Sequence, residues 1–320
     1  MEVDTNRWLL ADIGGTNARF ALYARDDAPR QVQATACASH PSIEAAIGAY
    51  LARHAPGVSL AGAAIAVAAP VNEDRVVLTN RDWSFSIAAL RSALGVRRLT
   101  VVNDFQAAAL SIPRLDDAAL AAIGPDLPRR AGVAAAIGPG TGLGMAGLVR
   151  SAGGWVAVPG EGGHATLAAQ DEREWRVLSR LQARYGHVST ERVVSGPGLV
   201  ELYAAIDAPS APDPALDSPA AVAAAADAGD PRAVAARAMF FDLLGTAAGN
   251  LALTLGARGG VYLFGGILPR MASALRNSGF RGRFEAKGRF RDYLAGIGTW
   301  LVTAPHPTFL GLAQCTEDVH

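Results

Sequence analysis

The chain has 320 residues, with 29 basic and 29 acidic side chains, and its formal net charge is zero. This length fits one large or two medium-sized globular domains. The balanced charge gives no reason to expect nucleic acid or an anionic membrane as a partner, since both attract an excess of lysine and arginine.

The two cysteines, Cys37 and Cys315, are far apart and belong to no CxxC or Cys/His spacing. This argues against a zinc site or a disulfide framework and favours a reducing cytoplasm. The N-terminal segment lacks the charged region and long apolar run of a signal peptide. The uncharged stretch 132–149 contains six glycines and a proline, which disfavours a membrane-spanning helix. We therefore expect a soluble protein.

Lysine occurs once, at Lys287, whereas arginine takes the other 28 basic positions. Codon bias explains such an excess, but the scarcity still excludes some sites. A P-loop ends in GK[ST] and a protein kinase needs a strand lysine, and the context FEAKGRF fits neither.

The first third of the chain alternates strand and helix patterns. Residues 8–13 and 19–23 predict two strands joined by a glycine turn, and later patterns predict a buried strand (61–71), a helix (86–94), and a strand that ends at Asn103 and Asp104 before another helix (99–110). This alternation predicts an α/β fold with a substantial parallel sheet, whose sites lie at the carboxyl ends of strands.

The segment 134–150 repeats the opening pattern, with an apolar strand, a glycine-rich turn containing threonine, and a second strand. Two such hairpins predict two α/β lobes related by internal duplication, with a cleft between them for ligands. The remaining pattern predicts an amphipathic helix at 171–186 with Trp175, Leu178, Leu181 and Tyr185 on one face, a surface excursion at 207–231 with a short alanine helix, a long helix at about 232–255, and a strand entering a glycine pair at 259–270.

Three glycine-rich turns indicate phosphate binding. Backbone N–H groups at such turns bind phosphate oxygens without a cationic side chain, because glycine permits positive φ and close approach. A single pair, Gly14-Gly15, also fits an ordinary hairpin turn. The second turn, 138–144, and the pair Gly265-Gly266 make coincidence a weaker explanation. A carboxylate near phosphate, as expected of Asp12, needs a cation, most simply Mg²⁺.

Asn103 and Asp104 suit a hydroxyl substrate, because the amide donates and accepts while the carboxylate can accept a proton from the attacking oxygen. The competing interpretation is an ordinary helix N-cap, which both residue types favour.

The glycine-rich loop 158–167 places Glu161 three residues before His164, a pair that fits polyol binding better than a surface histidine does. Glu191 is either a first-turn helix carboxylate or a third sugar ligand, and the pattern leaves both open. The histidines without a comparable context are expected to be surface or packing residues: His40, His54, His187, His306 and His320.

Six motifs follow one another in order: D-x-G-G-T-N-x-R, V-N-D-F, G-x-G-T-G-L-G, P-G-E-G-G-H, E-R-V-x-S-G-P-G and G-G-I-x-P-R. With them the chain, from Leu10 to the C-terminal PTFLGLAQ, closely resembles the bacterial glucokinase family. The resemblance implies a two-lobed hexokinase and actin-like fold with a cleft between the lobes. It also implies transfer of the ATP γ-phosphoryl group to the 6-hydroxyl of glucose, the first step of glycolysis.

The resemblance also implies roles for individual residues. Asp104 would be the general base, and Asp12 would lie on the Mg²⁺ side of Mg-ATP. The sugar hydroxyls would bind to Asn103, Asp104, Glu161, His164 and Glu191. The nucleotide would bind to Ala11, Asp12, Ile13, Gly14, Gly15, Thr16, Gly138, Thr141, Gly142, Gly265 and Gly266.

The same resemblance implies a small lobe formed by 1–113 and 304–320, a large lobe formed by 114–303, and a homodimer. The related ROK kinases carry a cysteine cluster that binds zinc, and with two cysteines this chain departs from that pattern.

Other functions on this fold stay open at the sequence level. A sugar-sensing regulator or an actin-like assembly protein would bind ATP without phosphorylating sugar. A kinase for mannose, fructose or an amino sugar would share these residue types, since epimers are distinguished by which hydroxyls find partners. Polyphosphate or ADP could also occupy glycine turns as the phosphoryl donor.

Overall fold

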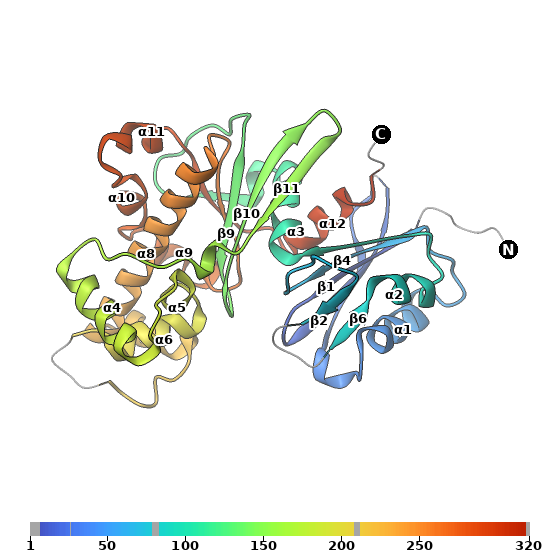
Figure 1. Ribbon diagram of the computed structural model, residues 1–320, viewed down its shortest axis with the longest axis horizontal. Helices are drawn as coiled ribbons and strands as arrows, with labels where there is room; N and C mark the ends of the chain where they lie inside the picture. The colour runs from blue at the N-terminus through green and yellow to red at the C-terminus, as the bar shows by residue number, and fades with distance from the viewer. Residues whose placement is uncertain (1–6, 26, 79–82, 208–211, 318–320) are drawn as a thin grey trace. The chain divides into compact units, whose positions relative to one another are not determined.

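The computed structural model describes residues 7–25, 27–78, 83–207 and 212–317 and divides into two compact units (Figure 1). Unit 1 comprises Met1–Asp116, Ser151–Ala157 and Ala304–His320, and unit 2 comprises Asp117–Arg150 and Val158–Thr303. The lobe boundaries expected from the sequence, 1–113 with 304–320 and 114–303, stay a prediction.

Unit 1 contains a five-stranded sheet in the order β3-β2-β1-β4-β7. Its strands are β1 (Arg7–Ile13), β2 (Asn17–Ala24), β3 (Arg30–Ala36), β4 (Gly62–Val67) and β7 (Arg98–Asn103). β1 and β2 form the expected antiparallel hairpin, while β4 pairs in parallel with both β1 and β7. The parallel strands therefore end at one edge, where the candidate residues of this unit lie.

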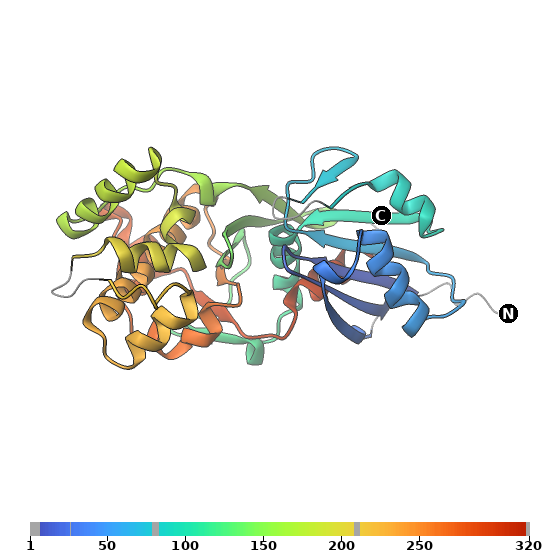
Figure 2. The same ribbon diagram turned by 90° about the horizontal axis from the view of Figure 1, so that it is seen from below.

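Helices cover both faces of this sheet (Figure 2). α1 (Ile43–His54) and α2 (Ile87–Ala93) pack on one face through Ile43, Ile47, Tyr50 and Leu90. α3 (Asp104–Ser111) and α12 (Pro307–Gln314) pack on the other through Ala107, Phe309 and Leu312. A two-stranded ribbon, β5 (Arg75–Val77) with β6 (Ser84–Ser86), completes the unit. The last helix thus belongs to the unit formed by the start of the chain.

A six-stranded sheet in the order β11-β10-β9-β12-β13-β8 belongs to unit 2, except for Ser151 of β10 and residues 154–157 of β11, which belong to unit 1. Its strands are β8 (Leu120–Ala122), β9 (Ala134–Pro139), β10 (Leu143–Ser151), β11 (Gly154–Gly160), β12 (Gly260–Leu263) and β13 (Thr299–Val302). The antiparallel β9–β10 hairpin and the parallel pairs of β12 with β9 and β13 repeat the pattern of unit 1, and β8 is an added edge strand. Both hairpins expected from the sequence are present.

The helices of unit 2 are α4 (Glu172–Tyr185), α5 (Thr190–Val193), α6 (Gly196–Ala205), α7 (Pro219–Asp227), α8 (Pro231–Leu255), α9 (Ala272–Arg276), α10 (Phe280–Glu285) and α11 (Arg291–Ala295). α8 is long and apolar enough to cross a membrane by length and composition, but 61% of its most apolar window is buried inside the unit. Its buried side chains include Phe240, Phe241 and Leu244, as in the core helix of a globular domain.

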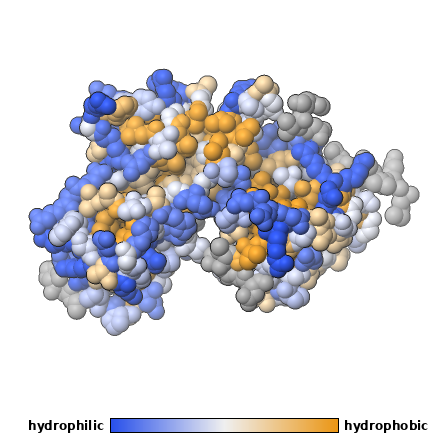
Figure 3. All heavy atoms as spheres, viewed as in Figure 1, coloured by the Kyte–Doolittle hydropathy of each residue, from blue (hydrophilic) through white to orange (hydrophobic). Residues whose placement is uncertain are grey.

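The prediction for α4 was wrong in one respect. The helix exists as expected, but Trp175 is 61% exposed, and the buried face is formed by Glu174, Val177, Leu178 and Leu181. These four follow the i, i+3, i+4, i+7 spacing of an amphipathic helix. The buried face therefore begins at Glu174, one residue before the predicted Trp175. Figure 3 shows further hydrophobic side chains at the surface over β10 and β11, where Val156 and Val158 are exposed.

Candidate functional site

The first glycine turn, in unit 1, is closed by its own backbone. Gly14 N donates to Asn17 O at 3.0 Å, and Cys37 N, directly after the end of β3, donates to Thr16 O at 2.9 Å. Thr16 is exposed at the turn, and the chain continues as β2 rather than as a helix. A phosphate at this turn would therefore meet backbone N–H groups without the help of a helix N-terminus.

Glycine serves these turns in a different way from the one expected. Gly14, Gly140 and Gly142 do not have positive φ, whereas Gly265 does, at 97°. A Cβ on Gly265 would fall 2.3 Å from Pro139 O, and a Cβ on Gly142 would fall 2.4 Å from Glu191 Oε2. Close approach of a neighbouring group therefore favours glycine at 142 and 265, whereas a Cβ on Gly140 or Gly266 would meet no atom within 4 Å.

Asp12 lies on β1 directly opposite Arg19 on β2. Arg19 Nη1 is 3.3 Å from Asp12 Oδ2, and the Asp12 side chain is 17% exposed. Burial raises the pKa of Asp12 above its ordinary value, and the Arg19 charge opposes this rise. A buried carboxylate of this kind is stabilised by any further positive charge, as the Mg²⁺ assignment requires.

Asn103 and Asp104 lie where β7 ends and α3 begins, at the carboxyl edge of the parallel strands. Asn103 is a helix N-cap: its Oδ1 accepts from Phe105 N at 2.9 Å, and its backbone N donates to the Gln106 side chain. The competing interpretation as a cap is thus correct for Asn103, whose Nδ2 also donates to Ala69 O. Asp104 follows the cap, and one of its oxygens accepts from Phe105 N.

The second glycine turn, in unit 2, is held together with the third glycine pair. Gly140 N donates to Gly142 O, and Gly196 N donates to Gly140 O, both at 2.8 Å. Phe264 N donates to Ile137 O, which places Gly265 and Gly266 beside the end of β9. Thr141, Gly265 and Gly266 are exposed there.

Glu161, His164 and Glu191 form a cluster in unit 2. His164 Nε2 lies 3.9 Å from Glu161 Oε2, and His164 Nδ1 lies 3.9 Å from Glu191 Oε1. The other Glu191 oxygen accepts from Leu143 N at 2.7 Å, against the glycine turn. Glu191 therefore touches both the candidate sugar residues and the candidate nucleotide turn.

The structure thus gathers the candidates into two groups. In unit 1, Asp12 and residues 14–16 share one edge with Asn103 and Asp104, because β1 and β7 flank β4 in parallel. In unit 2, the turn 138–142 lies with Glu191 and the third glycine pair. Ala11 and Ile13 are fully buried in the sheet, so their side chains support the turn and do not reach a ligand.

Arg19 is the residue that sequence reasoning left without a role. The signal was available, because a two-strand hairpin closed around residues 14–16 places residue 19 opposite residue 12. Among the residues that the structure describes, no three His, Cys, Asp or Glu side chains gather as a metal site.

Comparison with known proteins adds an independent line of evidence. A family model described as Glucokinase matches residues 9–319. The chain is 50% identical over 312 residues to a glucokinase of Paramagnetospirillum magneticum, covering 97% of each chain. It is 47% identical to a "Bifunctional protein glk" of Burkholderia pseudomallei, of which it spans 48%. It also superimposes on a glucokinase crystal structure from an Antarctic psychrotroph, with a TM-score of 0.85, 37% identity and coverage of 97% and 98% of the two chains.

Proposed function

Because this chain belongs to the glucokinase family, we propose that it transfers the γ-phosphoryl group of ATP to the 6-hydroxyl of glucose. The observation that carries the proposal is the match over nearly the whole chain, which includes every candidate residue from Ala11 to Gly266. The α/β fold with two related sheets is the one that this family shares with actin-like ATPases.

In the proposed reaction Asp104 accepts the proton of the attacking hydroxyl. Its position at the start of α3 fixes the carboxylate at the carboxyl edge of the sheet, and the Asn103 cap fixes the backbone around it. Phosphoryl transfer passes through a loose transition state, so orientation of the hydroxyl matters more than strong basicity.

The triphosphate is assigned to the glycine turns at 14–16 and 138–142 and to Gly265-Gly266. Their N–H groups would replace the lysine of a P-loop, which this chain lacks. Mg²⁺ bound with the triphosphate would neutralise its charge near Asp12, whose burial favours a positive neighbour. Arg19 would hold the Asp12 carboxylate in place.

The sugar hydroxyls are assigned to Asn103, Glu161, His164 and Glu191 together with Asp104. Carboxylates accept hydrogen bonds and the imidazole can donate or accept, so the set can pair with several hydroxyls. Because Asn103 already caps α3, it contributes the remaining N–H of its amide.

A coupled assay tests the proposal: purified protein with glucose, ATP and Mg²⁺, read as ADP release. We expect glucose-dependent ADP formation together with stoichiometric glucose 6-phosphate. No glucose-dependent ADP release would refute the kinase proposal and favour a sugar-sensing or assembly protein. A panel of mannose, fructose and glucosamine, repeated with ADP and polyphosphate as donors, then defines the specificity.

We further propose that the protein is a cytoplasmic homodimer. Cys37, which is buried, and Cys315, which is half-buried, are not joined in a disulfide, and this suits a reducing compartment. The dimer rests on the family resemblance, and light scattering coupled to size exclusion would test it against the 33.0 kDa mass of one chain.

A further inference from the structure

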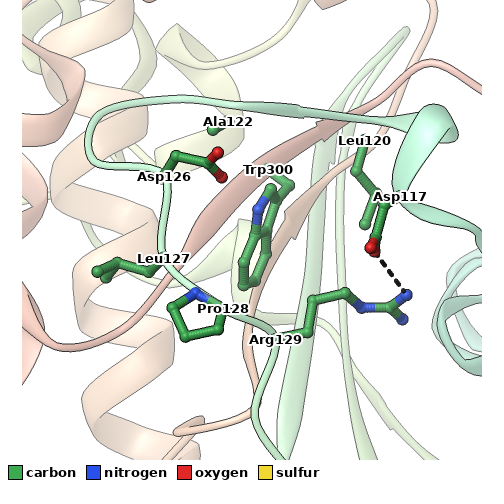
Figure 4. Close-up of a pocket in the computed structure, with 8 residues that line it drawn as sticks. All are labelled: Asp117, Leu120, Ala122, Asp126, Leu127, Pro128, Arg129 and Trp300. Carbon is green, nitrogen blue, oxygen red and sulfur yellow. Dashed lines mark ion pairs between the residues drawn. The ribbon is translucent and has the colours of Figure 1, made fainter.

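A pocket of about 480 Å³ opens in unit 2 beside the edge strand β8, and none of its lining residues is assigned to the reaction (Figure 4). Its size lies within the usual range for small-molecule sites. The lining residues are Asp117, Leu120, Ala122, Asp126, Leu127, Pro128, Arg129 and Trp300.

Trp300, on β13, is held rigidly in this pocket. A Cβ on Gly260 would fall 2.2 Å from its indole ring, and a Cβ on Gly298 would fall 2.1 Å from it, so glycine at both positions makes room for the ring. The Tyr262 ring lies 5.1 Å away on the neighbouring strand. The indole is therefore a fixed wall with little freedom to lose when a ligand binds.

The indole N–H of Trp300 has no hydrogen-bond partner among the described residues. Among the described residues, Arg283 Nε is the one side-chain nitrogen or oxygen that is buried from solvent and lacks a hydrogen-bond partner. The Trp300 Nε1 lacks a partner but is not in this class, so solvent can reach it. A buried ring with an unbonded, reachable N–H is a hydrogen-bond donor available to a ligand.

Asp126 supplies an unused acceptor. In the described part of the chain its carboxylate makes no hydrogen bond or ion pair, and Figure 4 shows it turned toward the Trp300 indole. Asp117 lies 3.8 Å from Arg129 Nη1 and is 94% exposed, while Arg129 Nε donates to Tyr262 OH at 3.2 Å. The pocket thus presents carboxylate acceptors together with guanidinium and indole donors.

This mixture selects the chemical class of the ligand. A cation would satisfy the two carboxylates but would be repelled by Arg129, and an anion would satisfy the donors but would face Asp117 and Asp126. A neutral polyol can donate to the carboxylates, accept from the indole and guanidinium groups, and lay its C–H groups against the ring. We propose that this pocket is a second carbohydrate site, which binds a neutral mono- or disaccharide distinct from the substrate being phosphorylated.

The indole N–H signals of the five tryptophans provide the test, in ¹H–¹⁵N spectra of the full chain. Trp300→Phe assigns the Trp300 signal, and saturating glucose keeps the substrate site filled while trehalose is added. We expect a saturable shift of the Trp300 signal and no shift of Trp175, which is an exposed tryptophan of the same unit.

A matched pair of variants isolates the carboxylate. Asp126→Asn is expected to weaken trehalose binding roughly tenfold, the usual cost of losing a hydrogen bond to a charged group, whereas the exposed Asp217→Asn leaves it unchanged. If Trp300→Phe fails to fold, the comparison of trehalose binding by Asp126→Asn and Asp217→Asn still tests the site.

Three results would overturn the proposal. The first is a Trp300 signal that does not move with trehalose, maltose or myo-inositol up to about 50 mM, a concentration that would reveal even a weak site. The second is an equal shift of Trp175. The third is tighter binding of phenethylammonium or trehalose 6-phosphate, which would assign the pocket to a charged ligand instead.

Discussion

Asp104 is the residue on which the proposed chemistry depends most directly. Replacing it with asparagine keeps the size and the N-terminal position in α3 but removes the proton acceptor. We expect kcat to fall by ~10² or more, the usual contribution of a general base, while glucose still binds.

Steady-state kinetics and calorimetry with glucose measure the two effects separately. Asp27→Asn, at an exposed ion pair of the same unit, is the control and should leave kcat unchanged. Near-normal turnover in Asp104→Asn would remove the base assignment even if the protein is a glucokinase.

Glu191 is expected to differ from His164 in which substrate it affects. Glu191 accepts from Leu143 N at the glycine turn and also lies near His164, whereas His164 has its charged neighbours in Glu161 and Glu191. Glu191→Ala should therefore raise KM for both ATP and glucose, and His164→Ala should raise KM for glucose alone. Loss of one hydrogen bond to a charged group corresponds to roughly ten- to a hundredfold in kcat/KM.

Initial rates with each substrate varied at saturating concentrations of the other separate these effects. Glu191→Gln, which keeps an acceptor oxygen for Leu143 N, should restore KM for ATP more than KM for glucose. If His164→Ala raised both constants equally, the cluster would act as a structural unit and not as a sugar site.

At the level of elements, the packing of α12 on α3 depends on Gly311. A Cβ there would fall 1.8 Å from Ala107 O on α3, and because this neighbour is backbone, the helices would have to separate. Gly311→Ala is expected to destabilise the protein by about 1–3 kcal/mol through overpacking, despite the better helix propensity of alanine.

The control is Gly48→Ala, in the exposed middle of α1 with no atom within 4 Å of the added Cβ. This change should stabilise by about 0.5–1 kcal/mol. Urea denaturation measures both, and a stabilising Gly311→Ala would show that α12 does not pack as described.

Asp242 on α8 gives a pH-dependent prediction. Burial raises its pKa above the ordinary 3.8, Arg283 opposes the rise, and Glu174 and Asp171 add to it. Between the two pKa values the folded state binds more protons than the unfolded state, so stability falls as pH rises through this window. Asp242→Asn should therefore raise Tm near pH 7.

The gain should shrink as the pH is lowered and vanish below 3.8, where the carboxyl is protonated in both states. Thermal scans of the variant and the native chain across this range provide the measurement, with Asp217→Asn as an exposed control on the same unit. A gain that is independent of pH would mean that shape and not charge decides stability at this position.

The sequence predicted elements better than it predicted contacts between them. Alternation over residues 8–23 predicted the β1–β2 hairpin, but the pairing of Asp12 with Arg19 was not predicted and follows from the strand register in the structure. Nothing local indicated that Glu191 would lie against Gly142, 49 positions earlier in the chain, because such contacts depend on how α5 packs against the sheet. Trp175 was misplaced because hydrophobicity alone suggested burial, although most protein surfaces contain some large apolar side chains.

At the scale of the whole molecule, the proposed residues are divided between the two units. Asn103 and Asp104 belong to unit 1, whereas Glu161, His164 and Glu191 belong to unit 2. A ligand bound by residues of both units stabilises both, since it is lost when either unfolds. Glucose at about 100 times its Kd should therefore add about 2.7 kcal/mol to the free energy of unfolding of each unit.

Hydrogen exchange read by mass spectrometry measures this separately for peptides of each unit. Glucose should slow exchange both in β7–α3 of unit 1 and in α5 and the 158–167 loop of unit 2. Trehalose, as a ligand of the proposed β8 pocket, should protect peptides of unit 2 that include 117–129 and leave β7–α3 unchanged, because every lining residue of that pocket belongs to unit 2. Protection by glucose confined to one unit would contradict the proposed assignment of sugar-binding residues to both units.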